Sequence, residues 1–151
     1  MRIIIQKVKE SSVKVDDEIV GQIKKGFLLL VGIETGDEEA DIQKAADKIA
    51  SMRIFEDDNG KMNLSIFDVG GEILSVSQFT LAANVQKGNR PSFIGAMTPE
   101  QANEYFMLLN QKLRDQGLKV ETGKFQEHME VSLINDGPVT IILDIKDGKV
   151  L

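Results

Sequence analysis

The sequence contains no cysteine and only one histidine, His128, among its 151 residues. Without thiols there is no disulfide scaffold, no thiolate zinc site and no cysteine nucleophile. A single histidine does not form a zinc site unless carboxylates complete it. If the protein is an enzyme, its chemistry must therefore rely on hydroxyls, amides and backbone groups.

Long apolar runs are also missing. No run approaches the roughly 20 residues that a membrane span requires. The segment Met1–Lys7 lacks the long apolar centre and the small-residue cleavage site of a signal peptide, so it is predicted to be a first strand. We therefore expect a cytoplasmic protein without a membrane partner, and the absence of cysteine is compatible with that compartment.

Positive charge is scarce relative to negative charge. The chain carries 24 acidic and 18 basic residues, which gives a net charge of -6. General nucleic-acid binders draw their affinity from phosphate neutralisation, so this balance argues against one. The charge balance does not exclude a protein that binds only the end of a nucleic acid in a local pocket.

The composition, with 42% hydrophobic and 28% charged residues, is that of an ordinary globular protein, and we expect a single domain over residues 1–151. Apolar residues at helical spacing predict a helix over about residues 38–53 and a second from Thr98 to near Gly117. Thr98 is the expected N-cap, with Pro99 in the first turn and Gln101 closing a capping box. Strands are predicted at residues 2–8, 11–15, 19–23, 27–33, 72–81, 119–122, 129–134 and 139–145, with a final hairpin at Asp147-Gly148. The strands group as hairpins, which favours an α+β fold with a mixed or antiparallel β-sheet curled into a barrel-like shape, plus two main helices.

The first candidate site is Ser77-Gln78-Phe79-Thr80, within the predicted strand 72–81. Alternation leaves neither face of this strand cleanly apolar. One interpretation is a buried strand whose hydroxyls bond to neighbouring backbone. The other is a strand end whose amides and hydroxyls line a pocket. Thr80 has no base near it in the sequence, which argues against a role as nucleophile.

The second candidate site is Asn135-Asp136-Gly137-Pro138, between two apolar strands. A tight hairpin turn accounts for the Asn, Asp and Gly. Pro138 is less expected there, and an X–Pro bond is one of the few peptide bonds that can be cis. A cis bond would turn two successive carbonyls toward the same side. Both interpretations, a plain turn and a functional motif, stay open.

Three other features carry weaker signals. Lys87 and Arg90 lie in a polar loop that is either solvated or in contact with phosphate. The acidic run Glu56-Asp57-Asp58 is either a divalent-metal cluster or a solvated turn. A triad of His128 with Ser77 is formally possible, but nothing in the spacing supports it.

Taken together, these motifs resemble the D-tyrosyl-tRNA deacylase family, the D-aminoacyl-tRNA deacylases of bacteria and eukaryotes. The motifs occur in family order and cover essentially the whole chain. The segments that carry the resemblance are Arg53–Asp57, Gly60–Leu64, Val76–Leu81, Lys87–Phe93 and Val131–Thr140.

The resemblance implies a homodimer with its active site at the subunit interface and with no cofactor or metal. The Gly137-Pro138 bond would be cis, and each subunit would insert this pair into its partner's pocket, whose wall is Ser77–Thr80. The implied substrate is the ester that joins a D-amino acid, or glycine, to the terminal adenosine of tRNA. Carbonyls of Gly137 and Pro138 would accept hydrogen bonds from the α-ammonium and would leave no room for an L side chain. Backbone N–H groups around Gln78 to Thr80 would stabilise the oxyanion, and the ribose 2′-hydroxyl would assist the water.

Contacts with the tRNA end are also expected. Phe125 offers a stacking surface for the terminal adenine, although a core position explains it equally well. Lys87 and Arg90, together with Lys61, would form a basic rim. Two residues depart from the family. Lys7 stands where an arginine is thought to brace the Gly-Pro carbonyls, and Asn84 replaces a common aspartate. The competing function is a non-catalytic dimeric module that binds a free small molecule or D-amino acid.

Overall fold

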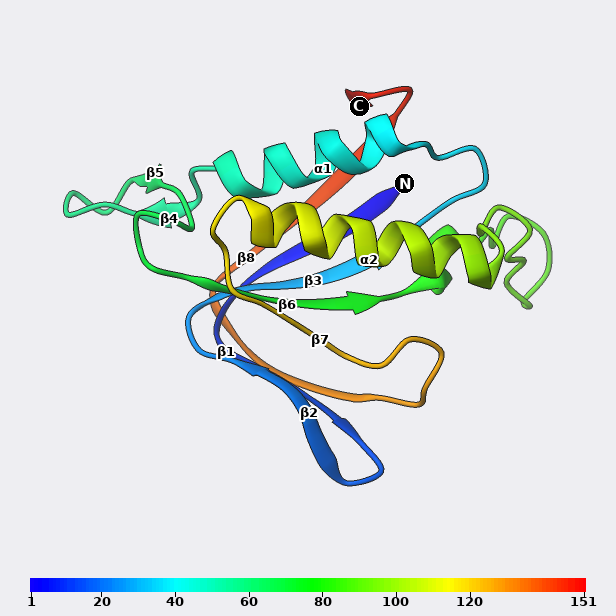
Figure 1. Ribbon diagram of the computed structural model, residues 1–151, viewed down its shortest axis with the longest axis horizontal. Coiled ribbons are helices and arrows are strands. Elements are labelled where there is room, and N and C mark those ends of the chain that lie inside the picture. The colour runs from blue at the N-terminus through cyan, green and yellow to red at the C-terminus, as the bar shows by residue number, and fades with distance from the viewer.

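Two helices lie side by side on one face of a curled β-sheet (Figure 1) in a computed structural model that describes residues 1–151. This arrangement confirms the predicted α+β fold with two main helices. The elements in chain order are β1 (Arg2–Val15), β2 (Glu18–Ile23), β3 (Gly26–Gly32), α1 (Glu39–Ser51), β4 (Phe55–Glu56), β5 (Met62–Leu64), β6 (Glu72–Ser77), the 3-10 helix η1 (Phe79–Ala82), α2 (Pro99–Asp115), β7 (Val120–Thr122), β8 (Glu130–Lys146) and β9 (Lys149–Val150).

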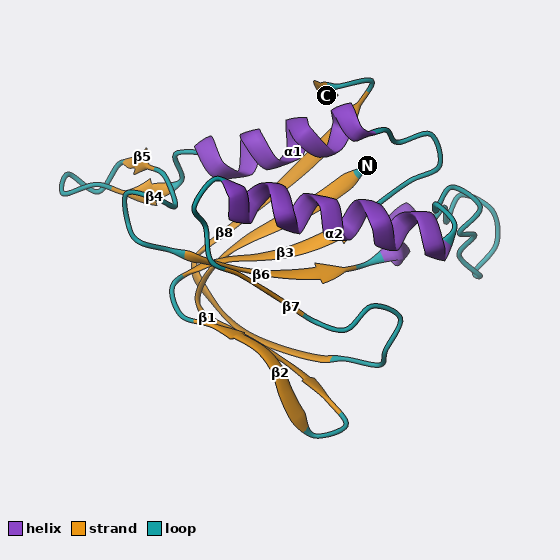
Figure 2. Cartoon of the chain, viewed as in Figure 1, coloured by secondary structure: helices purple, strands orange, loops and turns teal.

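The sheet is mixed, as the sequence predicts. Its strand order is β7-β6-β3-β1-β8-β9, and β2 pairs with β1. Strands β3, β6 and β7 run parallel, whereas β1 pairs antiparallel with β2, β3 and β8. Strands β1, β2 and β8 bend away from the helices, which curls the sheet into a half-open barrel (Figure 2). No helix has the length and apolar character needed to cross a membrane.

The hydrophobic core lies between the helices and the sheet. Strand side chains alternate between the two faces, so Ile3, Ile5 and Phe27 meet the apolar sides of both helices. Phe27 stacks on Phe55 with 5.2 Å between ring centroids. A smaller cluster, which includes Val8 and six other residues, fills the inside of the curl. Side chains that alternate along the strands therefore form both apolar clusters, one on each face of the sheet.

The helix boundaries agree with the sequence prediction to within about two residues. Thr98 is the N-cap of α2, and Pro99 is its first residue. The predicted capping box with Gln101 is wrong, because no side-chain cap hydrogen bond forms there. A capping box forms instead at α1, where the Glu38 N–H donates to the Asp41 carboxylate at 2.8 Å.

Two predicted interruptions of strands are absent. Residues 2–8 and 11–15 belong to one strand, β1, and residues 129–134 and 139–145 belong to another, β8. Each of these long strands is the other's partner over nearly its full length. Pairing with a continuous neighbour therefore keeps each strand extended through its polar middle.

Of the two interpretations of Asn135–Pro138, the plain hairpin turn is wrong, because a bulge in β8 takes its place. Gln6 pairs with Thr140 and Val8 pairs with Asn135, so the four residues of β8 between those partners lie opposite the single residue Lys7. Bulges of this kind push backbone out of a sheet. The Gly137-Pro138 peptide bond within the bulge is cis, and both residues are exposed.

An ion pair between directly opposed residues of β1 and β8 should make stability depend on acid pH. The Arg2 guanidinium donates to the Asp144 oxygens at 2.7 and 3.0 Å. These hydrogen bonds hold the pKa of Asp144 below its ordinary value. A depressed carboxyl pKa adds stability that is present above the unfolded pKa, about 3.9, and is lost as the pH falls through the folded pKa.

We therefore expect Asp144→Asn to lower the free energy of unfolding by about 0.5 kcal/mol at neutral pH, since the pair is partly exposed. The difference from the wild-type protein should shrink as the pH falls through the folded pKa of Asp144. Urea unfolding at neutral pH and at a series of acid pH values measures it. Asp58→Asn removes an exposed carboxylate that has no partner, and is the control. A deficit in Asp144→Asn that persists unchanged in acid would contradict the prediction.

Candidate active site

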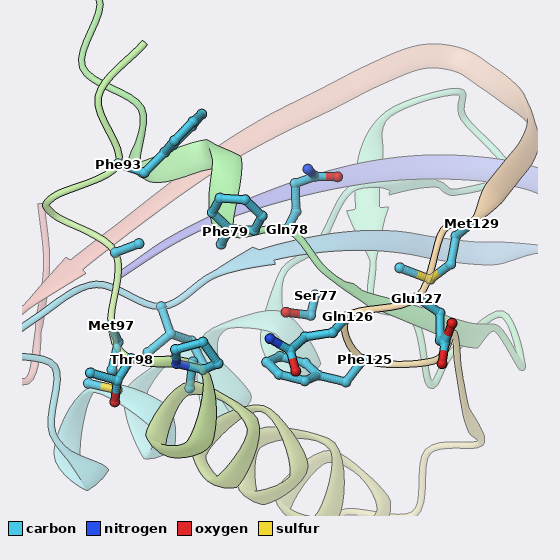
Figure 3. Close-up of a pocket in the computed structure, with 14 residues that line it drawn as sticks. Ser77, Gln78, Phe79, Phe93, Met97, Thr98, Phe125, Gln126, Glu127 and Met129 are labelled. Carbon is cyan, nitrogen blue, oxygen red and sulfur yellow. The ribbon is translucent and has the colours of Figure 1, made fainter.

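A cavity of about 590 Å³ opens where β6 ends, beside the first turn of α2 and the segment that leads into β8 (Figure 3). Its wall is mainly apolar and includes Phe79, Phe93 and Met97. The Ser77 side chain lies between the rings of Phe79 and Phe125 in this view. Ligand sites are typically apolar clefts with a few polar groups, which is the composition found here.

The position of Ser77 is fixed by the sheet. Ser77 is the last residue of β6 and pairs with Val31 of β3. The Gln78 N–H still donates to the Val31 carbonyl at 2.8 Å, and the chain then leaves the sheet as the 3-10 helix η1. The predicted strand over residues 72–81 is therefore four residues too long. The strand ends at the cavity, and Ser77, Gln78 and Phe79 line it.

The free backbone donors of the motif are few. The Gln78 N–H is used by Val31, as just described. Phe79 and Thr80 are the first residues of η1, and the first N–H groups of a helix have no acceptor within it. Two successive N–H groups of this kind form the type of donor pair that stabilises an oxyanion.

No side-chain base is hydrogen-bonded to the hydroxyls of Ser77 or Thr80. The Thr80 hydroxyl accepts a hydrogen bond from the Gln78 amide, and Thr80 does not line the cavity. The Ser77 hydroxyl has no hydrogen-bond partner, and the exposed His128 also lies outside the cavity wall. Nucleophilic catalysis by serine or threonine needs an adjacent base, so this arrangement suits activation of water rather than a covalent intermediate.

The position of Phe125 fits both interpretations that the sequence left open. Its ring packs against Phe106 of α2, with 6.4 Å between centroids, and it lies against the main core. It also lines the cavity. A ring held from behind by the core while its other side faces a cavity offers a firm stacking surface.

Gly137 and Pro138 are not part of this cavity. The bulge lies opposite Lys7, which pairs with Phe27, and Phe27 in turn pairs with Ile73. Ile73 is four residues before Ser77 on β6, which is about 13 Å along a strand. The Gly-Pro pair therefore lies away from the cavity of its own chain.

Lys7 is not paired with the bulge in this chain. Its side chain is buried, and the ammonium lies 5.5 Å from the centroid of the Phe55 ring. No hydrogen bond joins it to Gly137 or Pro138. A cation over an aromatic face is a favourable contact, so the structure places Lys7 in the core between sheet and helices.

The basic candidates do not form a single rim. Lys87 and Arg90 are exposed on a loop closed by two backbone hydrogen bonds between Asn84 and Ser92, at 2.8 and 2.9 Å. This loop projects near the start of α2, whereas Lys61 lies in the β4–β5 hairpin at the other end of the helices (Figure 1). Lys61 therefore does not form one continuous rim with Lys87 and Arg90 within a single chain.

The acidic run Glu56-Asp57-Asp58 forms the solvated turn that the sequence allowed. The Asp57 carboxylate accepts hydrogen bonds from the N–H groups of Asn59 at 2.9 Å and Lys61 at 3.0 Å. These hydrogen bonds lower the pKa of Asp57, and the bond from the Lys61 N–H has the largest effect. The carboxylate is thus occupied in closing its own turn.

Sequence reasoning missed much of the cavity wall. Phe93, Met97, Gln126, Glu127 and Met129 all line it. The polar residues after Phe125 lie between two predicted strands, and this break in the apolar pattern was a signal for Gln126 and Glu127. Gln126 has a φ of 65°, in the left-handed region. Nothing in the spacing of Phe93 or Met97 connects either residue to Ser77.

Comparison with known proteins identifies the family. The sequence model of the D-Tyr-tRNA(Tyr) deacylase family matches residues 4–144. A D-aminoacyl-tRNA deacylase of Lactobacillus gasseri is 60% identical over 145 residues, which are 96% of this chain and 100% of that protein. A solved structure described as the c-Myc DNA unwinding element binding protein has a TM-score of 0.91 and 39% identity, covering 97% of this chain and 99% of that one.

A second solved structure, described as a probable eukaryotic D-amino acid tRNA deacylase, has a TM-score of 0.83. It covers 95% of this chain and 98% of its own, but at 16% identity it shows only that the fold is shared. The resemblance inferred from the motifs is confirmed. The chain belongs to the D-Tyr-tRNA(Tyr) deacylase family, whose members are hydrolases that act on ester bonds.

Proposed function

We propose that this protein hydrolyses the ester of D-aminoacyl-tRNA, and of glycyl-tRNA mischarged on tRNA-Ala, while it spares L-aminoacyl-tRNA. The observation that carries the proposal is the family motif Ser77-Gln78-Phe79 in the wall of a largely apolar cavity, where no side-chain base is hydrogen-bonded to the Ser77 hydroxyl. An aminoacyl ester is already activated, so placing a water molecule and stabilising the oxyanion are sufficient for useful catalysis.

The chemical step would depend on backbone and substrate. The N–H groups of Phe79 and Thr80 would donate to the oxyanion that forms when water attacks the ester carbonyl. The 2′-hydroxyl of the terminal ribose would orient the water, since the protein supplies no base at that point. The Ser77 hydroxyl, which has no partner within the protein, lies close enough to the cavity to contact the substrate.

Chirality would be sensed by the bulge of a second copy in a homodimer. The Gly-Pro pair is exposed and lies far from the cavity of its own chain, which supports this arrangement. Carbonyls of Gly137 and Pro138 would accept hydrogen bonds from the α-ammonium and occupy the space that an L side chain needs. A D side chain would point toward solvent, and glycine has no side chain to exclude.

Only the end of the tRNA would enter the cavity, a mode of binding that is compatible with the acidic net charge of -6. The terminal adenine would stack on Phe125. Lys87 and Arg90 would contact phosphates, so affinity should be modest and should fall with salt. Such an editing enzyme would act in the cytoplasm, where tRNA is charged.

The test is deacylation of D-tyrosyl-tRNA, L-tyrosyl-tRNA and glycyl-tRNA-Ala by the purified protein, each compared with buffer alone. We expect the D and glycyl esters to be hydrolysed and the L ester to survive, with kcat/KM at least about 100-fold apart, because steric exclusion of this kind separates substrates by several kcal/mol. Efficient hydrolysis of L-tyrosyl-tRNA would refute the chiral mechanism. Binding of free D-amino acid without any hydrolysis would indicate the non-catalytic module instead.

A further inference from the structure

Glu127 is the single ionisable side chain among the 14 residues that line the cavity. It lies in the segment between Phe125 and β8, beside Met129 and away from Phe93 in Figure 3. The remaining wall consists of apolar side chains and neutral polar groups. A carboxylate at this place is therefore the main local source of electric field in the cavity.

Nothing in the chain neutralises this carboxylate. Glu127 takes part in none of the four ion pairs of the structure, and its side chain forms no hydrogen bond. Only its backbone is fixed, because the Glu127 N–H donates to the Lys124 carbonyl at 3.3 Å. The residue is exposed, so it stands at the mouth of the cavity and not in its floor.

We propose that Glu127 sets a charge preference among D-aminoacyl esters and disfavours those with acidic side chains. The inference rests on the proposed function, in which the D side chain leaves the cavity toward solvent. The α-ammonium is common to every substrate, so attraction to it does not distinguish one ester from another. The side-chain charge differs between substrates, and it is the quantity that a carboxylate at the mouth would sense.

The size of the effect follows from Coulomb's law. Two like charges about 7 Å apart, with an effective dielectric constant between about 20 and 80, repel enough to lower kcat/KM by about 3- to 50-fold. Salt screens exposed charges over about 10 Å at 0.1 M. The preference should therefore be largest at low ionic strength.

The experiment compares D-aspartyl-tRNA with D-asparaginyl-tRNA, whose side chains have nearly the same shape and differ in charge. For the wild-type protein at low salt we expect kcat/KM for the asparaginyl ester to exceed that for the aspartyl ester by about 10-fold. In Glu127→Gln this ratio should fall severalfold toward unity. In 0.5 M salt the wild-type ratio should fall in the same direction.

Glu130→Gln is the matched control. Glu130 is exposed at the start of β8, pairs with Lys14 of β1 and does not line the cavity, so its removal changes the net charge by the same amount but changes the field inside the cavity less. It should keep the wild-type ratio. Thermal melting checks that both variants are folded, as substitutions at exposed positions should be.

The outcomes separate this inference from the function on which it rests. Hydrolysis of both esters with an unchanged ratio in Glu127→Gln would overturn the charge preference alone. A ratio that falls equally in Glu130→Gln would also overturn it, because the overall charge would then be responsible. If Glu127→Gln accelerates both esters equally, the carboxylate acts on the RNA and the inference fails. Absence of hydrolysis of D-asparaginyl-tRNA would overturn the proposed function itself.

Discussion

Gly137→Ala is expected to lower kcat/KM for D-tyrosyl-tRNA by about 100-fold and to reduce the preference for the D over the L ester. Gly137 has a φ of 137°, which side chains rarely adopt. A Cβ at this position would lie 2.9 Å from Val139 Cγ2 and 3.0 Å from Val139 N. The bulge must therefore shift to admit the methyl group, and a displacement of about 1 Å in a positioning group can cost about 100-fold in rate.

The measurement is deacylation of D- and L-tyrosyl-tRNA under single-turnover and steady-state conditions. Gly148→Ala is the matched control, since Gly148 also has a positive φ, of 70°, but its nearest Cβ contact is an ordinary 3.7 Å. Gly148 belongs to the β8–β9 turn, and the Gly148→Ala variant should keep the wild-type rate of deacylation. Wild-type activity and D selectivity in Gly137→Ala would show that the bulge takes no part in selection.

Gly26→Ala is expected to destabilise the fold by about 3–5 kcal/mol, the largest effect on stability that we predict. A Cβ on Gly26 would lie 1.8 Å from the Glu72 carbonyl oxygen and 2.6 Å from the Glu72 nitrogen. Both of these are backbone atoms of β6, so no side chain can rotate away. The methyl group must force β6 from β3 at the first pair of their parallel ladder.

Urea unfolding of Gly26→Ala measures the loss, and a fall in soluble yield should accompany it because total stability is only about 5–15 kcal/mol. Gly36→Ala is the control: its φ is 94°, but no atom lies within 4 Å of the added Cβ. It should lose only the roughly 1–2 kcal/mol of the left-handed conformation. Equal losses in the two variants would mean that the contact with β6 is not the cause.

The helices and most strands could be predicted because their apolar periodicity is local. The middle of β8 could not be predicted in this way. Asn135 to Pro138 have the chemistry of a tight turn, and only the continuous partner β1, far away in sequence, keeps both halves in one strand. The end of β6 was also misjudged. The Ser77–Leu81 pattern continues as a strand would, but β3 ends at Gly32 and offers β6 no partner beyond Ser77.

The residues of the candidate site also fall into those that local sequence could predict and those that it could not. Ser77 to Phe79 were identified from a contiguous motif, and Phe125 from its residue type. Glu127 and Phe93 were missed because they reach the cavity through the paths of loops, which sequence periodicity does not encode. Lys61 was grouped with Lys87 and Arg90 on charge alone, and the structure separates them to opposite ends of the helices.

The separation of the Gly137-Pro138 bulge from the cavity of its own chain has a genetic consequence. If the two features act together only across a dimer, a protein impaired in the bulge and a protein impaired in the Ser77–Phe79 segment each retain what the other lacks. Co-expression of the two would assemble mixed pairs in which one site is wholly intact and the other carries both lesions. Two inactive alleles would then complement each other, as alleles altered within one and the same pocket would not.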